Sequence, residues 1–185
     1  MIQRLYPARP VVPDLLFTLL PDIPLLAYLT DPIMAAAIVL ILWYAFRRDR
    51  RHLPYYFFTV GAAYLGRGLL MALTPLGRPT GNLDSYGIFQ VVSLKQHGMF
   101  PSGHVTLAAA MYFLIDGRRH PGFKRALGIL GLAEIATLLL SRGHYSIDLA
   151  GGVMLGYLAV HLASGRRERF RLEGPLEGSG GEPTA

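Results

Sequence analysis

Five stretches of predominantly apolar residues follow one another along the chain. Each is close to the ~20 residues that a helix needs to cross the hydrocarbon core of a bilayer. They are Pro24–Phe46, Leu53–Leu76, Met99–Ile115, Ala126–Leu140 and Tyr145–Ser164. Because hydrocarbon offers no water to backbone polar groups, such stretches must be helical. The sequence therefore predicts an all-α integral membrane protein, a bundle of five transmembrane helices.

Both ends of the chain differ from this pattern. The apolar segment Leu15–Leu20 is followed by two prolines and an aspartate, which interrupt a helix. We expect residues 1–23 to form an interfacial segment; a sixth span would require Leu15–Leu29 to cross the membrane. Residues 1–172 are predicted to be one membrane-embedded domain. Residues 173–185 are rich in Gly, Pro, Glu and Ser, so we expect a disordered C-terminal tail.

Composition supports a membrane protein and excludes several other classes. The 185 residues are 52% hydrophobic and 16% charged, against about 25% charged in soluble domains. No cysteine is present, which excludes disulfide scaffolds, thiol catalysis and iron–sulfur clusters. The net charge of +6 would suit nucleic acid, but the basic residues lie in short blocks between apolar stretches, as in membrane proteins. The expected partner is the lipid bilayer, with no nucleic acid.

The basic residues also predict an orientation, since cytoplasmic loops carry an excess of Lys and Arg. Three loops or tails that share one side hold most of them: Arg47, Arg48, Arg50, Arg51, Arg118, Arg119, Lys124, Arg125, Arg166, Arg167, Arg169 and Arg171. The other side holds fewer: Arg4, Arg9, Arg78, Lys95 and Arg142. We therefore expect a plasma or inner membrane protein with a cytoplasmic C-terminus, and with loop 77–98 and the turn Ser141–His144 outside.

Two polar clusters begin two different predicted spans on that outer side. Pro101-Ser102-Gly103-His104 opens the third span, and Arg142-Gly143-His144-Tyr145-Ser146-Ile147-Asp148 opens the fifth. His144 and Asp148 are four residues apart, so on a helix the carboxylate can orient the imidazole and leave its other nitrogen free as a nucleophile or base. A helix start that carries Ser102 and Gly103 suits an anionic phosphate, and a second histidine could protonate a leaving oxygen.

Other polar residues admit two interpretations each. Arg67 and Glu134 lie at similar depths in their spans, which favours a structural ion pair over contacts with substrate. The loop cations Arg78, Lys95 and Arg142 could hold phosphate oxygens or contact lipid headgroups. His97 and Asp84 make a metal site conceivable, but their spacing fits no standard ligand pattern. On the fifth span, Gly152 and Gly156 form a GxxxG pattern typical of close helix packing.

The PSGH element and the His-x₃-Asp element resemble those of the type 2 phosphatidic acid phosphatase superfamily, over about residues 60–160. The resemblance implies that His144 attacks phosphorus to form a phosphohistidine, that Asp148 orients it, and that His104 is the general acid. Ser102 and Gly103 would bind phosphate. Two positions depart from the superfamily pattern, because Met71 stands where a lysine is usual and Leu138 where an arginine is usual.

The local strings Met99-Phe100-Pro101-Ser102-Gly103-His104 and His144-Tyr145-Ser146-Ile147-Asp148 look more like the sphingomyelin synthase branch of that superfamily. That branch moves a phospholipid headgroup onto a lipid alcohol. Pro101 and the short chain resemble the phosphatase branch instead.

The predicted function is a lipid phosphatase that cleaves a lipid phosphoester at the extracytoplasmic face through a phosphohistidine, with no metal and no cofactor. Hydrolysis is favoured because no acceptor site is identifiable. The alternatives are a headgroup phosphotransferase like sphingomyelin synthase, and a non-catalytic lipid-binding protein. The substrate is expected to be a membrane phospholipid or lipid phosphate; the sequence specifies neither which lipid nor the oligomeric state.

Overall fold

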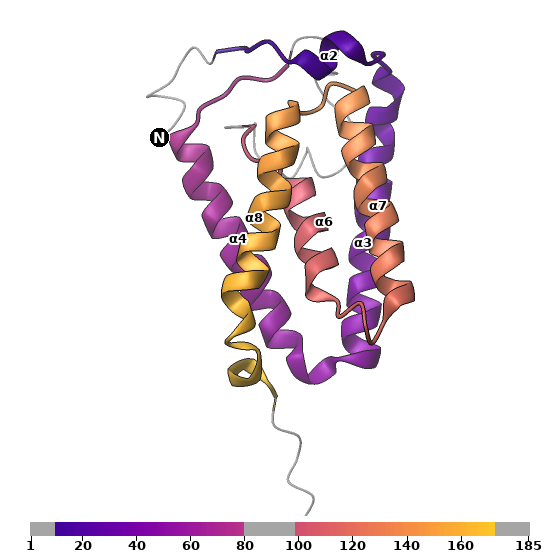
Figure 1. Ribbon diagram of the computed structural model, residues 1–185, viewed down its shortest axis with the longest axis vertical. Coiled ribbons are helices and arrows are strands. Elements are labelled where there is room, and N and C mark those ends of the chain that lie inside the picture. Colours follow the sequence, from indigo (N-terminus) through magenta and orange to yellow (C-terminus); the bar gives the residue numbers. More distant parts are fainter. Residues whose placement is uncertain (1–9, 80–98, 173–185) are drawn as a thin grey trace, which may run out of the picture.

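The computed structural model describes residues 10–79 and 99–172, and within these ranges the chain forms helices and no strand (Figure 1). Its long helices are α3 (Ala27–Arg48), α4 (Leu53–Leu73), α6 (Gly103–Leu114), α7 (Pro121–Leu140) and α8 (Ser146–Ser164). Shorter elements are α2 (Leu15–Leu19) and the 3₁₀ turns η1 (Pro24–Leu26), η2 (Arg50–His52) and η3 (Arg167–Phe170). The predicted all-α fold is confirmed for these residues, with one long helix in each of the five apolar stretches.

Within residues 10–79 and 99–172, three helical segments are long and apolar enough to cross a membrane: Pro24–Arg48, Arg50–Leu73 and Ser146–Ser164. The other two expected spans do not reach this standard. α6 has 12 residues and rises only about 18 Å, which is short of the ~30 Å hydrocarbon core. α7 has 20 residues but includes Lys124, Arg125 and Glu134, and charged side chains are costly in hydrocarbon. The five expected spans are thus five helices, of which three are candidate membrane spans.

The N-terminal segment does not provide a sixth span. α2 is only five residues long and buries none of them. The carboxylate of Asp14 caps it by accepting a hydrogen bond from the backbone N–H of Leu16 at 2.9 Å. After α2 the chain passes through η1 directly into α3. Leu15–Leu29 therefore contains the end of one short helix and the start of a long one. The predicted tail at 173–185 lies outside the described residues.

α6 is the shortest of the five long helices. It lies between the other long helices and packs most extensively on α8 (Figure 1). Two glycines of α8 make this contact possible. A Cβ atom on Gly152 would come within 3.0 Å of the carbonyl oxygen of Ser102, and one on Gly156 would come within 2.7 Å of the carbonyl oxygen of Thr106. A larger residue at Gly156 would push the two backbones apart. The close packing predicted for Gly152 and Gly156 is confirmed.

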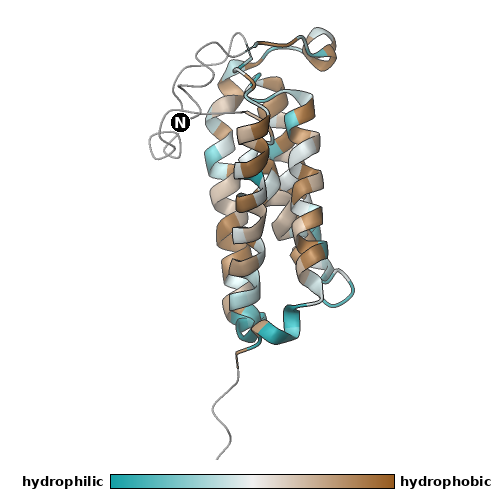
Figure 2. Cartoon of the chain, turned by 90° about the vertical axis from the view of Figure 1, so that its left-hand side faces the viewer, coloured by the Kyte–Doolittle hydropathy of each residue, from teal (hydrophilic) through white to brown (hydrophobic). Residues whose placement is uncertain are grey.

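The two ends of the bundle differ in character. At the histidine end, defined as the end where α6 and α8 begin, His104 lies in the first turn of α6 and His144 in the turn just before the neighbouring α8. At the arginine end, defined as the corner where η2 joins α3 to α4, four arginines and His52 follow one another closely. Figure 2 shows hydrophobic residues along the helices and hydrophilic residues gathered at this corner. η3 returns to the same corner, where the backbone N–H of Leu172 donates to the carbonyl oxygen of Arg51 at 2.7 Å.

Candidate active site

The start of α8 holds the His144–Asp148 pair in one compact turn. Nδ1 of His144 lies 3.2 Å from Oδ2 of Asp148, and the same oxygen accepts a hydrogen bond from the backbone N–H of Tyr145 at 3.2 Å. The side chain of Asp148 is fully buried, and that of His144 is 13% exposed. Among the described residues, Nε2 of His144 makes no hydrogen bond. The carboxylate therefore orients the ring and leaves the second nitrogen available for chemistry.

The start of α6 is joined directly to this turn. The backbone N–H of Ser102 donates to the carbonyl oxygen of Asp148 at 3.0 Å, so the two motifs begin their helices side by side. Ser102 is the N-cap of α6, because its hydroxyl oxygen accepts from the backbone N–H of Val105 at 3.5 Å. The next backbone N–H groups of α6 are the positive end of a helix dipole, which favours an anion.

Arg67 reaches this point from the middle of α4. Its Nε–H donates to the carbonyl oxygen of Pro101 at 3.0 Å, and its guanidinium interacts electrostatically with Asp148. A Cβ atom on Gly103 would stand 3.0 Å from Nε and 3.1 Å from Cζ of Arg67. Glycine at 103 therefore permits the close approach of a cation to the helix start. Arg67 brings positive charge beside both motifs.

His104 has a carboxylate partner of its own. Its Nε2 lies 3.7 Å from Oδ1 of Asp31, which extends from α3. His104 is also close enough to His144 for their charges to interact. Asp31 is not among the site residues predicted from the sequence. Its signal was an acidic residue within an apolar stretch, a position that is costly and typically functional. The histidine end thus gathers two histidines, each beside a carboxylate.

The predicted ion pair between Arg67 and Glu134 does not form. Arg67 contacts Pro101, whereas the carboxylate oxygens of Glu134 have no hydrogen-bond partner among the described residues, although the side chain is fully buried. The two residues stand at similar depths in their predicted spans, but α6 packs between α4 and α7 and separates them. The carboxyl group of Glu134 instead interacts electrostatically with Asp31.

Arg142 is directed away from the two histidines, toward the N-terminal segment. Its Nε lies 3.1 Å from the carboxylate of Asp22, and its Nη2 donates to the carbonyl oxygen of Phe17 at 2.8 Å. The guanidinium also covers the Phe17 ring at 4.7 Å. The residue has a φ of 53°, a left-handed conformation that is uncommon outside glycine. These contacts fasten α2 and the residues after it to the turn before α8, and the phosphate contact expected of Arg142 stays a prediction.

The same segment covers the His144 turn through contacts that the sequence did not predict. Oδ2 of Asp14 accepts a hydrogen bond from the backbone N–H of Ser146 at 2.6 Å. The rings of Phe17 and Tyr145 stack with centroids 5.8 Å apart. Residues 14–22 therefore hold the beginning of α8 in place.

Four further candidates lie at or beyond the edge of the described residues. Arg78 is half-buried at the end of the stretch 10–79, next to Gly77, whose backbone N–H donates to the carbonyl oxygen of Pro10 at 3.0 Å. Lys95, His97 and Asp84 lie outside the described residues. Within the described ranges, no group of three histidine or acidic side chains is arranged to hold a metal ion.

Together these features define a helical membrane protein that gathers two histidine–carboxylate pairs at one end of its bundle. The chain belongs to the family described as AtPDCT1/2, whose model matches residues 19–165. Two curated relatives from Arabidopsis thaliana are phosphatidylcholine:diacylglycerol cholinephosphotransferases 2 and 1, each 39% identical over 99 residues. Each alignment covers 52% of this chain and 32% of the relative, so the chain spans about a third of the curated relatives' length. No solved structure matches the chain.

The predicted membership of the type 2 phosphatidic acid phosphatase superfamily, with its sphingomyelin synthase branch, is therefore wrong. The family model that matches over most of the chain describes AtPDCT1/2, and the two relatives are named as cholinephosphotransferases. The prediction depended on strings of four to six residues. Such strings specify a local arrangement of side chains, whereas family membership depends on the whole helical domain.

Proposed function

We propose that this protein is a phospholipid headgroup phosphotransferase that moves phosphocholine from phosphatidylcholine to diacylglycerol. The observation that carries the proposal is the pairing of His144–Asp148 and His104–Asp31 at one end of the bundle. Family membership and the names of the relatives favour transfer over hydrolysis. The preference for a phosphatase came from the lack of an identifiable acceptor site, and nothing in the comparisons supports it.

The proposed reaction has two displacement steps on one histidine. In the first, Nε2 of His144 attacks phosphorus and the bond from phosphorus to the glycerol oxygen breaks. The protonated imidazole of His104 gives its proton to that oxygen, and diacylglycerol leaves. In the second step an acceptor diacylglycerol gives its hydroxyl proton to His104, its oxygen attacks phosphorus, and the bond to His144 breaks. Phosphatidylcholine is formed and both histidines return to their starting states.

The surrounding groups suit these steps. Asp148 would orient His144 and stabilise its positive charge, and Asp31 would do the same for His104. Arg67 and the backbone N–H groups after Ser102 would bind phosphate oxygens, with Gly103 keeping the approach open. Among the loop cations, Arg78 remains a candidate for the phosphate. A phosphodiester carries one negative charge, which fits this small set of cations.

The proposed topology has five membrane spans. They are the three long apolar segments described above, together with α6 and α7. The excess of Arg and Lys at the arginine end supports a cytoplasmic location for that end and for the C-terminus. The two histidines would then act at the extracytoplasmic surface of a plasma or inner membrane. The single domain would cover residues 1–172, in agreement with a family match over 19–165.

The test uses the full chain in vesicles that contain choline-labelled phosphatidylcholine and a diacylglycerol with distinguishable acyl chains. We expect labelled phosphatidylcholine that carries the acceptor's chains, and a choline-labelled phosphocholine group bound to His144 that is stable in alkali and labile in acid. His144→Ala should reduce transfer at least about 10³-fold. The matched variant His52→Ala, which changes the histidine at the other end, should keep the wild-type rate.

Each other outcome has a defined meaning. Release of free phosphocholine would show that water is the acceptor and would overturn the transferase. Transfer that survives in His144→Ala would overturn the covalent step. Lipid binding without any product, from folded wild-type protein, would indicate the non-catalytic alternative.

A further inference from the structure

An apolar groove opens between α6, α7 and α8 on the outside of the bundle. Its volume is about 260 Å³. Its wall includes Val105, Ala108 and Tyr112 from α6, Gly128 and Gly131 from α7, and Val153 from α8. The groove exists because α7 and α8 each pack on α6 and have little contact with each other. Figure 1 shows α6 between these two helices.

The groove begins directly beneath the proposed catalytic turn. α7 ends at Leu140 and α8 begins at Ser146, so the connection that carries His144 lies at the same end of the helices as Val105 and Ile135, which line the groove. Val105 follows His104 in the chain, and together with Leu138 and Leu149 it forms a small apolar cluster under that turn. A hydrocarbon chain in the groove would thus lie immediately below a headgroup held at His144.

The opposite limit of the groove is polar. Nζ of Lys124 lies 4.7 Å from the centre of the Tyr112 ring and donates to the carbonyl oxygen of Ile115 at 3.1 Å. From Val105 to Phe113, the groove runs about 12 Å along α6. Among the described residues, no charged side chain lines it. A volume below the ~300 Å³ of the smallest drug-sized pockets fits part of one hydrocarbon chain and excludes a whole diacyl lipid.

Two glycines keep the wall of α7 open. A Cβ atom on Gly128 would stand 3.3 Å from Cε2 of Tyr112, and one on Gly131 would stand 3.8 Å from the Cβ atom of Ala108. A leucine at either position would therefore extend into the groove. By contrast, Gly122 at the start of the same helix has no atom within 4 Å of its added Cβ.

We propose that this groove binds one acyl chain of the donor phosphatidylcholine and so positions its phosphorus at His144, an inference that rests on the proposed function. The occupant is a hydrocarbon chain because no charged side chain among the described residues lines the groove along its length of about 12 Å. The continuity with the His144 turn assigns the groove to the substrate lipid rather than to the general lipid surroundings of the bundle.

The test is photo-crosslinking of the full chain in phosphatidylglycerol vesicles, with a trace of phosphatidylcholine that carries a diazirine in one acyl chain. We expect label on residues 105–113 and 127–132 well above that on Leu65 and Leu69, which are apolar residues of α4 with 70% and 62% exposure. Unlabelled phosphatidylcholine should displace this label, and added phosphatidylglycerol should not. Gly131→Leu should reduce it about tenfold, and Gly122→Leu should leave it unchanged.

Label in the groove that does not exceed the label on Leu65 and Leu69, or that phosphatidylglycerol displaces equally, would show ordinary surrounding lipid and overturn the proposal. Cross-links to a second copy of the chain in place of lipid would also overturn it. Because labelling needs no turnover, specific labelling without transfer would contradict the proposed function and leave the groove assignment standing. Conversely, wild-type transfer from long-chain phosphatidylcholine by folded Gly131→Leu would contradict the groove alone.

Discussion

The two ends of this protein each contain a histidine beside an aspartate, but only the histidine end has the features of a candidate active site. At the arginine end, Nδ1 of His52 lies 2.6 Å from Oδ1 of Asp49. At the histidine end, the corresponding distance between His144 and Asp148 is 3.2 Å. The shorter of these two distances belongs to the arginine end, which has neither of the motifs that begin α6 and α8. A histidine–aspartate contact by itself therefore does not distinguish a catalytic from a structural role.

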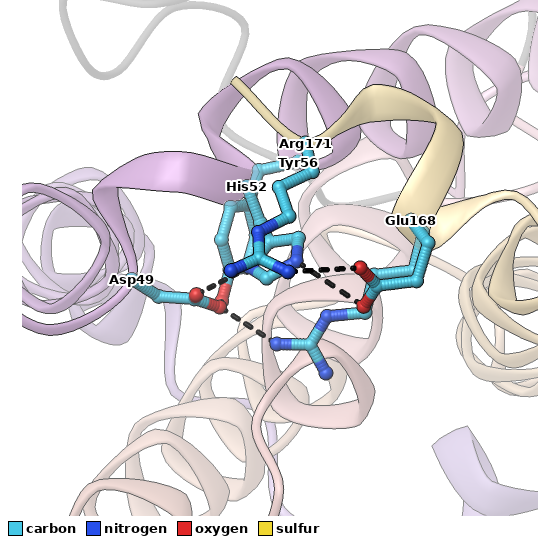
Figure 3. A network of polar contacts seen from close by, with 6 residues as sticks. Asp49, His52, Tyr56, Glu168 and Arg171 are labelled. Atoms are coloured by element: carbon cyan, nitrogen blue, oxygen red, sulfur yellow. Dashed lines mark hydrogen bonds and ion pairs between the residues drawn. The ribbon is translucent and has the colours of Figure 1, made fainter. Parts of the chain in front are cut away.

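The difference lies in what else binds each pair. Asp49 accepts hydrogen bonds from the hydroxyl of Tyr56 and from Arg167, both at 2.8 Å, and Nε2 of His52 faces Glu168 at 3.6 Å (Figure 3). Both oxygens of Asp49 are thus engaged in joining η3 to the α3–α4 corner, and Nε2 of His52, which makes no hydrogen bond within the described ranges, is covered by the Glu168 carboxylate at ion-pair distance. At the histidine end the second nitrogen of His144 has no such partner among the described residues. The pair at the arginine end therefore has a structural role, whereas the pair at the histidine end leaves Nε2 of His144 available for chemistry.

The largest effect that sharpens this comparison is expected at Asp148. Asp148→Asn keeps an oxygen that can cap Tyr145 but loses the charge that orients and stabilises His144. We expect transfer to fall about 10²- to 10⁴-fold, measured as the initial rate of labelled phosphatidylcholine formation. Asp49→Asn, the same change at the arginine end, should retain transfer in the folded protein. Equal losses from the two variants would show that both pairs serve only the fold.

A smaller loss is expected at Asp31, which approaches His104 from a different helix. Asp31→Asn should lower the transfer rate about 10- to 100-fold, because the protonated form of His104 loses its carboxylate partner. Asp31→Glu should restore part of the rate, since a longer side chain can still reach the imidazole. A rate unchanged in Asp31→Asn would remove the second histidine–carboxylate pair from the proposed mechanism.

A modest effect is expected where the N-terminal segment covers the His144 turn. Asp14→Ala removes the acceptor of the Ser146 backbone N–H and should reduce kcat about 3- to 30-fold with little change in KM, because the turn loses support without losing a substrate contact. Thr18→Ala, on the exposed face of α2, is the control and should have no effect. A change in KM alone would mean that residues 14–22 bind lipid instead.

The smallest effect on transfer is expected at Asp49, where stability should change instead. Burial alone would raise the pKa of Asp49, but hydrogen bonds from His52 and Tyr56 and the charge of Arg167 together hold the pKa below its ordinary value. A lowered pKa means stabilisation that is present above the ordinary carboxyl range and is lost as pH falls through the folded-state pKa. Asp49→Asn should therefore cost about 1–3 kcal/mol at neutral pH.

Thermal unfolding at pH 7 and at pH 3 would measure this. The gap in stability between wild type and Asp49→Asn should narrow at the lower pH, because pH 3 lies below the ordinary carboxyl pKa and the unfolded wild-type chain takes up a proton there. A gap that stays constant would show that packing, and not the charge of Asp49, makes the contact.

Helix positions could be predicted well because their causes are local. Apolar stretches specified α3, α4 and α8 to within a few residues. Ser102 is the N-cap of α6, so this helix begins at Gly103 and not at the predicted Met99. Pro121, which is favourable in a first helical turn, started α7 before the predicted Ala126. The resemblance to phosphatases was wrong because family membership is not a local property. Short motifs describe a few residues, whereas membership depends on the whole domain.

The amino-acid sequence by itself determined that the chain is helical and apolar, and that Ser102–His104 and His144–Asp148 begin two helices at one end. These outcomes follow from hydrophobic stretches, caps and the alternation of helix direction, all of which act over a few residues or one crossing. Only the tertiary structure decided that Asp31 pairs with His104, that Arg142 turns to Asp22, and that Arg67 and Glu134 stay apart. Such contacts depend on how each helix is rotated and which helices are neighbours, and those quantities are set by packing across the whole bundle.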